Sequence, residues 1–145
     1  MPTRQPAQLD RPLIAAAMLG LSAGMRTFAP PVALAVRERG PFHGPARLVA
    51  FAGGAVELAA DKLPTTGSRW GPGPVAGRIV SASIGGRELD GWKGAGIAAL
   101  ASVATAYTGA RLRTSVRGRA AQLGAAVAED ALCYGLALAA VRQER

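Results

Sequence analysis

The sequence predicts an all-α fold, a polytopic bundle of membrane helices. Three observations predict it. Half of the 145 residues are hydrophobic, the apolar residues gather in long runs, and loops rich in Gly, Pro and Arg separate these runs. Ala and Gly dominate the runs, and small residues let membrane helices approach each other closely. Because the mean hydropathy is only +0.20, a soluble, Ala-rich helical protein is the alternative.

The first apolar run covers residues 13–36 and follows a polar extension, residues 1–12. The run is long enough to span a bilayer. It contains Arg26 and the pair Pro30-Pro31, and two consecutive prolines should kink or break a helix. A cleaved signal peptide is the other interpretation of its first half. We favour a retained helix, because the cleavage signal is poor and the apolar character resumes after Arg26.

Three further runs complete the predicted spans. Residues 46–63 would form a helix of about 27 Å, which Pro64 should end. Residues 94–110 carry no charge, and residues 120–141 would form a helix of about 33 Å. The sequence thus predicts four transmembrane helices.

Residues 75–89 have a helical pattern but are short for a span and contain Arg78 and Arg87. We predict a short or re-entrant helical segment here. The membrane helix bundle then covers residues 13–141, with a C-terminal tail at residues 142–145, and the predicted location is the cell membrane, as a multi-pass protein.

The charges indicate which partners to expect. The net charge is +8, and most arginines lie between the apolar runs, where juxtamembrane charge belongs. The basic loop at residues 111–119 has no aromatic residue for base stacking. We therefore expect a lipid bilayer as partner and no nucleic acid. Lys and Arg are nearly balanced between the two sides, so the orientation stays open.

Enzymatic chemistry has little support in the sequence. The single cysteine, Cys133, and the single histidine, His43, are too far apart to suggest a metal site. Nucleophilic triads and phosphate-binding loops are absent. We expect no enzyme activity, no metal and no cofactor.

Charged residues inside apolar runs carry most of the functional information, because each is costly in lipid. Arg26 lies near the middle of its run, as do Glu129 and Asp130. We therefore expect Arg26 to pair with Glu129 or Asp130, and Glu57 and Arg78 are candidates to join them. One carboxylate could bind a proton or a cation. The structural interpretation is an ion-pair cluster that only fixes helix packing.

Helical spacing predicts two packing faces. Gly53, Glu57 and Asp61 are four residues apart and form one stripe. Gly20 and Gly24 form a pair of small residues against which another helix can pack. Asp61 and Lys62 lie in the last turn of their helix, where both can reach headgroups and water, and Lys62 complements the helix C-terminus.

Three motifs resemble a known family. The motifs are Gly24-Met25-Arg26-Thr27-Phe28-Ala29-Pro30, Glu57-Leu58-Ala59-Ala60-Asp61-Lys62-Leu63-Pro64 and Glu129-Asp130-Ala131. They resemble the small bacterial membrane proteins catalogued as domain of unknown function 4126, over about residues 13–141. The resemblance implies a multi-helix membrane fold. It also implies that the charged residues of these motifs, together with Pro64, are signature positions of the family. Longer members carry an uncharged polar residue in place of Arg26 and a longer third segment.

Three functions compete at this point. The first is a small channel or transporter for an ion, a proton or a solute, in which Glu57 and Glu129-Asp130 bind the cation and Arg26 is a counter-ion. The second is a structural or scaffolding membrane protein whose charges only fix helix packing. The third is a lipid-modifying enzyme using Glu57 and Asp61, which no nucleophile supports. A bundle this small is also a candidate homo-oligomer.

Overall fold

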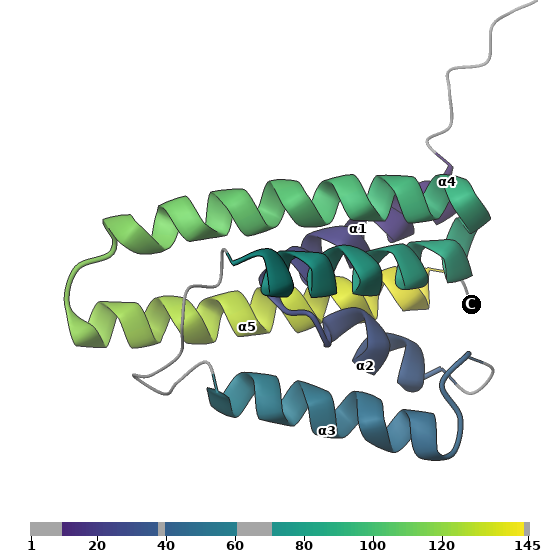
Figure 1. The fold of residues 1–145 in the computed structure, drawn as a ribbon, viewed down its shortest axis with the longest axis horizontal. Coiled ribbons are helices and arrows are strands. Elements are labelled where there is room, and N and C mark those ends of the chain that lie inside the picture. The colour runs from purple at the N-terminus through teal and green to yellow at the C-terminus, as the bar shows by residue number, and fades with distance from the viewer. Residues whose placement is uncertain (1–9, 38–39, 61–70, 144–145) are drawn as a thin grey trace, which may run out of the picture.

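The computed structural model describes residues 10–37, 40–60 and 71–143, without the side chains of residues 113 and 114. The described part is all-helical, in agreement with the predicted class. Figure 1 shows the helices in chain order: α1 (Arg11–Met25), α2 (Ala29–Ala35), α3 (Pro45–Ala60), α4 (Pro72–Ser115) and α5 (Arg119–Arg142).

The first apolar run is broken into α1 and α2. α1 ends at Met25, and the next residue, Arg26, has extended backbone angles (φ −141°, ψ 123°). The break was expected at Pro30-Pro31, but both prolines lie in the first turn of α2. Proline fits a first helical turn, whereas further along it would clash with the preceding turn. The break therefore lies just before the prolines.

α4 is a helical hairpin. Its regular geometry is interrupted at Asp90 (φ −148°, ψ 41°) and Gly91 (φ 53°, ψ −142°). We call residues 72–89 its first arm and residues 92–115 its second arm. A Cβ on Gly86 would lie 2.2 Å from the carbonyl oxygen of Gly94, so the two arms touch backbone to backbone near the turn (Figure 1). The ambiguous segment at residues 75–89 is thus one arm of a hairpin, and its partner arm extends into the predicted basic loop.

α1 lies at the centre of the bundle. It packs against both arms of α4 and against α5. A Cβ on Gly20 would lie 2.3 Å from the carbonyl oxygen of Ala98, and one on Gly24 would lie 2.4 Å from that of Ser102. The predicted small-residue pair is confirmed as the contact between α1 and the second arm of α4.

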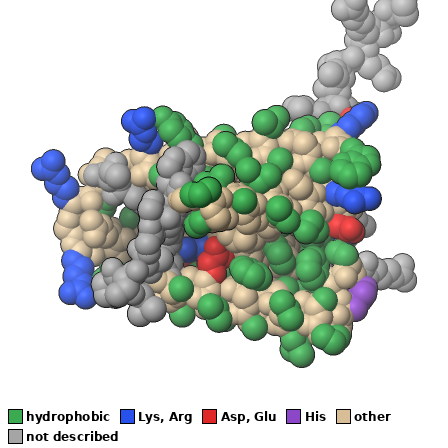
Figure 2. All heavy atoms as spheres, in the orientation of Figure 1, with side chains coloured by type: hydrophobic (Ala, Val, Ile, Leu, Met, Phe, Trp, Pro, Cys, Tyr) green, Lys and Arg blue, Asp and Glu red, His purple; other side chains and the backbone are tan. Residues whose placement is uncertain are grey.

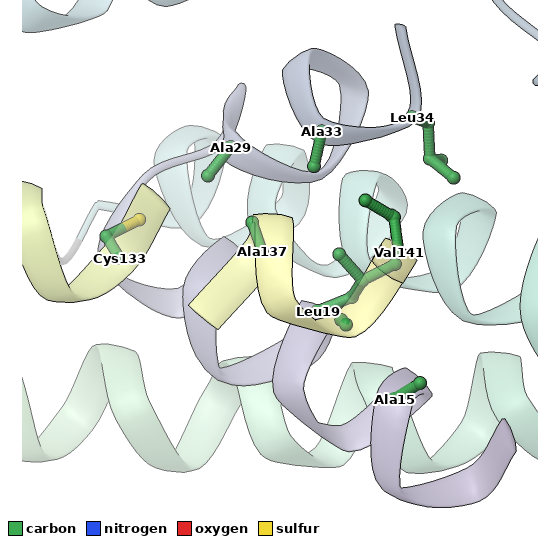
Figure 3. Close-up of a cluster of buried hydrophobic side chains, with 9 residues drawn as sticks. Ala15, Leu19, Ala29, Ala33, Leu34, Cys133, Ala137 and Val141 are labelled. Atoms are coloured by element: carbon green, nitrogen blue, oxygen red, sulfur yellow. The ribbon is translucent and has the colours of Figure 1, made fainter. Parts of the chain in front are cut away.

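The largest buried cluster joins α1, α2 and α5 (Figure 3). Its members are mostly alanines, because the helices approach too closely for larger side chains. The fully buried members are Ala15, Leu19, Ala29, Ala33, Leu34, Cys133, Ala137 and Ala140, with Val141 almost as buried.

α3 lies on the outside of the bundle, against α2 (Figure 1). Gly53 makes the contact, since a Cβ there would lie 2.1 Å from the ring of Phe28. Elsewhere on α3, the side chains of Leu48, Val49 and Val56 are exposed. Of the predicted stripe on this helix, Gly53 thus faces another element, while Asp61 lies outside the described residues.

The prediction of four transmembrane helices is wrong. In the described part of the chain, only α5, with 24 residues, is long and apolar enough to cross a membrane. α1 has 15 residues and α3 has 16, which correspond to about 22–24 Å against a hydrocarbon core of about 30 Å. α4 is divided at its turn, and charged residues flank that turn. The apolar runs were long, but the helices within them are not.

The surface nevertheless keeps much of its apolar character. Only 22% of the most apolar stretch of α5 is buried, whereas the core helix of a soluble protein would be mostly buried. Figure 2 shows hydrophobic side chains spread over the middle of the visible face, while Lys and Arg gather toward the two ends of the long axis. Exposed apolar side chains on several helices favour contact with a membrane or with another protein.

Candidate functional site

Polar side chains converge on the gap between α1 and α2. We call this cluster the break site and define it by Arg26 in the gap, Glu57 from α3, Ser81 from the first arm of α4 and Asp130 from α5. Each of the three other helices thus contributes one side chain to a gap of three residues, 26–28.

Arg26 and Asp130 form a buried ion pair. Asp130 Oδ1 accepts a hydrogen bond of 2.7 Å from Arg26 Nε and a second, shorter one from Nη2. The Arg26 side chain is 2% exposed and that of Asp130 is 15% exposed. Asp130 lies about 17 Å from the start of α5, close to its midpoint. The predicted pairing is confirmed, with Asp130 and not Glu129 as the acceptor of these two bonds.

Glu57 caps the start of α2. Its Oε1 accepts a hydrogen bond of 2.7 Å from the backbone N–H of Thr27, and its Oε2 accepts one of 2.9 Å from that of Phe28. Thr27 and Phe28 directly precede α2, so their N–H groups have no partner within that helix and lie at the positive end of its dipole. A carboxylate is therefore well suited to this position, and it joins α3 to the break.

The carbonyl groups near the break also have partners. Ser81 Oγ donates a hydrogen bond of 2.5 Å to the carbonyl oxygen of Thr27. The carbonyl oxygen of Ser22 accepts from the backbone N–H of Arg26, at 2.9 Å, and from Cys133 Sγ, at 3.2 Å. These bonds satisfy backbone groups that the interrupted helix would otherwise leave buried and unpaired.

A small cavity of about 30 Å³ adjoins the end of α1. Arg78, which is 7% exposed, and Glu129 both line it, beside Thr105 of the second arm of α4. The volume is enough for one or two water molecules. Two of the predicted charged residues therefore line a cavity next to the break site, and this cavity has room for only a few atoms.

The structure brings together most of the predicted site residues. Arg26, Glu57 and Asp130 belong to the break site, and Arg78 and Glu129 line the adjoining cavity. Asp61 and Lys62 lie outside the described residues. Within the described ranges, no group of three or more His, Cys, Asp and Glu side chains could hold a metal ion.

Sequence reasoning missed Ser81 and the two backbone N–H groups that Glu57 binds. Ser81 had a weak signal, because a hydroxyl in an apolar helix usually bonds to backbone. The backbone N–H groups had no signal in the sequence, since which of them lack a helical partner depends on where the helix breaks. An unpaired N–H becomes visible only once α1 and α2 are separate helices.

Comparisons with models of known protein families, with curated proteins and with solved structures found no match. The resemblance of the three sequence motifs to domain of unknown function 4126 therefore stays a prediction. The fold itself defines the class, a helical protein whose described residues include one candidate membrane-spanning helix.

Proposed function

We propose that this chain is a membrane protein with a structural role, in which the buried charges fix how the helices pack and the assembled bundle serves as a scaffold for another membrane protein. The proposal rests on one observation, that both carboxylates of the break site already accept hydrogen bonds from the protein. Asp130 accepts from Arg26, and both oxygens of Glu57 accept from backbone N–H groups.

These contacts favour the structural role over ion transport. A carboxylate that binds a transported cation must exchange its ligands at each cycle. For Glu57, exchange would leave two N–H groups at the start of α2 without acceptors, and for Asp130 it would leave a buried guanidinium without its anion. Each unpaired group of this kind costs roughly 1–3 kcal/mol, and more where the group is charged.

The membrane location has its own support. The exposed large hydrophobic side chains occur on α3, on both arms of α4 and on α5, so they do not form one confined docking patch. α5 supplies a candidate span, and its outward side chains Leu123, Val127 and Leu132 are each more than half exposed. The motif resemblance to a family of membrane proteins agrees with this location.

The test combines stability with flux. Wild type, Asp130→Asn and Glu57→Gln are purified in detergent, and their thermal unfolding and their proton and ion flux in proteoliposomes are measured. We expect both variants to unfold at lower temperature and no sample to conduct. Wild-type flux that disappears in a variant with unchanged stability would overturn the structural role in favour of transport.

The cavity supports a second candidate function, a proton or ion path. Glu129 and Arg78 line a water-sized space beside a broken helix, and broken helices are common at transport sites. The discriminating variant is Glu129→Gln, because Glu129 lines the cavity together with Arg78. Loss of wild-type flux in folded Glu129→Gln protein would establish the path, and normal flux in that variant would remove Glu129 from it.

A further inference from the structure

α3 has the reverse of the usual polarity of a surface helix. Its acidic residue, Glu57, turns inward to the residues before α2, and both of its glycines lie on the packed side. We call its exposed apolar side the outer side of α3. At 100° per residue, the outer side spans about 160° of the helix circumference. Its members are Leu48, Val49, Phe51, Ala52, Ala55, Val56 and Ala59. Figure 2 shows hydrophobic side chains along the lower edge of the molecule, where Figure 1 places α3.

The composition of the outer side favours lipid over a partner helix. A surface helix of a soluble protein turns its polar residues outward, but here the outward residues are all apolar. Membrane helices pack against each other through small residues, whereas Leu48, Val49 and Val56 are large and each more than 60% exposed. The seam of a helix with one partner helix is also narrower than about 100°. Acyl chains can cover a wider arc than a single helix can.

The neighbours of α3 on α5 set its depth. A Cβ on Gly54 would lie 3.3 Å from the hydroxyl of Tyr134, and Tyr134 is about 12 Å from Arg142 along α5. Three residues further along α3, Glu57 belongs to the break site together with Asp130, which precedes Tyr134 by four residues. The two helices therefore run antiparallel, as Figure 1 shows. The middle of α3 thus lies about 12 Å from the Arg142 end of the candidate span.

The start of α3 lies level with that end. Arg47 precedes Gly54 by seven residues, or about 10 Å. Its guanidinium lies 5.8 Å from the centre of the Phe51 ring. An arginine beside an aromatic ring suits the membrane interface, where the charged group reaches the headgroups and the apolar part stays in the chains. No charged residue lies between Arg47 and Glu57.

We propose that the outer side of α3 contacts the acyl chains of the bilayer, with Arg47 at the headgroups on the Arg142 side. The inference rests on the membrane location proposed above. It does not require α3 to cross, because the hydrocarbon core is about 30 Å thick and one leaflet supplies about 15 Å of it. Leu48 then lies close to the headgroups, and Val56, about eight residues deeper, lies near the centre of the bilayer.

The experiment uses tryptophan as a depth reporter. The chain has two tryptophans, so Trp70→Phe with Trp92→Phe gives a background without them. Leu48→Trp and Val56→Trp are introduced singly into this background. Leu132→Trp on α5 is the matched control, because the antiparallel register places it at the depth of Val56. All three positions are exposed, so the new rings need no room in the core. The proteins are reconstituted into phosphatidylcholine vesicles with bromines either near the headgroup or deep in the acyl chains.

We expect the ratio of shallow to deep quenching to reverse along α3. Leu48→Trp should be quenched more strongly by the shallow bromines, and Val56→Trp more strongly by the deep ones. Leu132→Trp should give the same ratio as Val56→Trp. Each reporter protein should unfold at the same temperature as the background protein, which shows that the new ring has not changed the fold.

The outcomes separate this inference from the proposed function. Deep quenching of Leu132→Trp without quenching of Val56→Trp would mean that protein covers the outer side of α3. That result, or a shallow preference at position 56, would overturn the inference and leave the membrane location intact. Protein that does not float with the vesicles would overturn both.

Discussion

Replacement of Asp130 by alanine tests the central ion pair. The substitution removes the oxygen that accepts two hydrogen bonds from Arg26 and leaves an arginine side chain that is 2% exposed. Loss of one partner of a buried pair costs roughly 3–5 kcal/mol. Because the Asp130 side chain keeps 15% of its exposure, water can partly compensate, and we expect the lower end of this range.

The assay is thermal unfolding in detergent, followed by circular dichroism. For a chain of this size, each kcal/mol lowers the midpoint by about 2–4 °C, so Asp130→Ala should unfold roughly 6–12 °C below wild type. Glu88→Gln is the matched control, because Glu88 is an exposed carboxylate on α4, and surface changes of this kind stay within about 0.5 kcal/mol.

A double variant separates the loss of a partner from the loss of packing. Arg26→Met combined with Asp130→Leu replaces the pair by apolar side chains of similar volume, and such replacements are often neutral or stabilising. We expect the double variant to recover most of the midpoint that Asp130→Ala loses. A single variant as stable as wild type, or a double variant as unstable as the single one, would refute the assignment of this pair to helix packing.

Three further predictions concern the break, the helix contact and the hairpin turn. Glu57→Ala should lower stability by about 1–2 kcal/mol, as the loss of a helix cap does, and should speed hydrogen exchange at the amides of Thr27 and Phe28. Unchanged exchange there would mean that Glu57 does not protect them. Gly20→Ala should cost about 1–3 kcal/mol, because its Cβ would meet the backbone of Ala98. Gly96→Ala has open space at the new Cβ and should gain up to about 1 kcal/mol from helix propensity, and equal midpoints for the two variants would contradict the close contact. Gly91→Ala should cost about 1–3 kcal/mol, since φ is +53° with ψ at −142°, and a midpoint equal to that of Gly96→Ala would show that the turn is not strained by a side chain.

The sequence predicted the partners in the break site better than their roles. An arginine within an apolar run needs an anion, and Glu129 and Asp130 lie at the middle of the last apolar run. The choice between Glu129 and Asp130 was open, because adjacent residues point about 100° apart around a helix and the packing of α5 on α1 decides which one faces Arg26. The role of Glu57 as a cap could not be predicted, since its partners are backbone groups 29 and 30 residues away.

The prediction of membrane spans failed for a different reason. Hydropathy measures how apolar a run is, but a span also requires one continuous helix. Pro30-Pro31 could equally have kinked one long helix, and only the structure places the break before them. At Asp90-Gly91 the sequence contains no proline, and the turn depends on a backbone conformation that glycine alone adopts readily.

The order in which the chain is made gives the break site a further consequence. Arg26 and Asp130 are separated by 104 residues, and at synthesis rates of about 5–20 residues per second the arginine precedes its anion by roughly 5–20 seconds. During this interval, α1 has been synthesised, while Asp130, which pairs with the arginine at the end of α1, has not. Arg26 must spend that time in water, at a lipid headgroup or on a chaperone. The central helix can therefore take its final place in the bundle only after Asp130 has been translated, and Arg26 should be accessible to water-soluble reagents in a nascent chain truncated before Asp130.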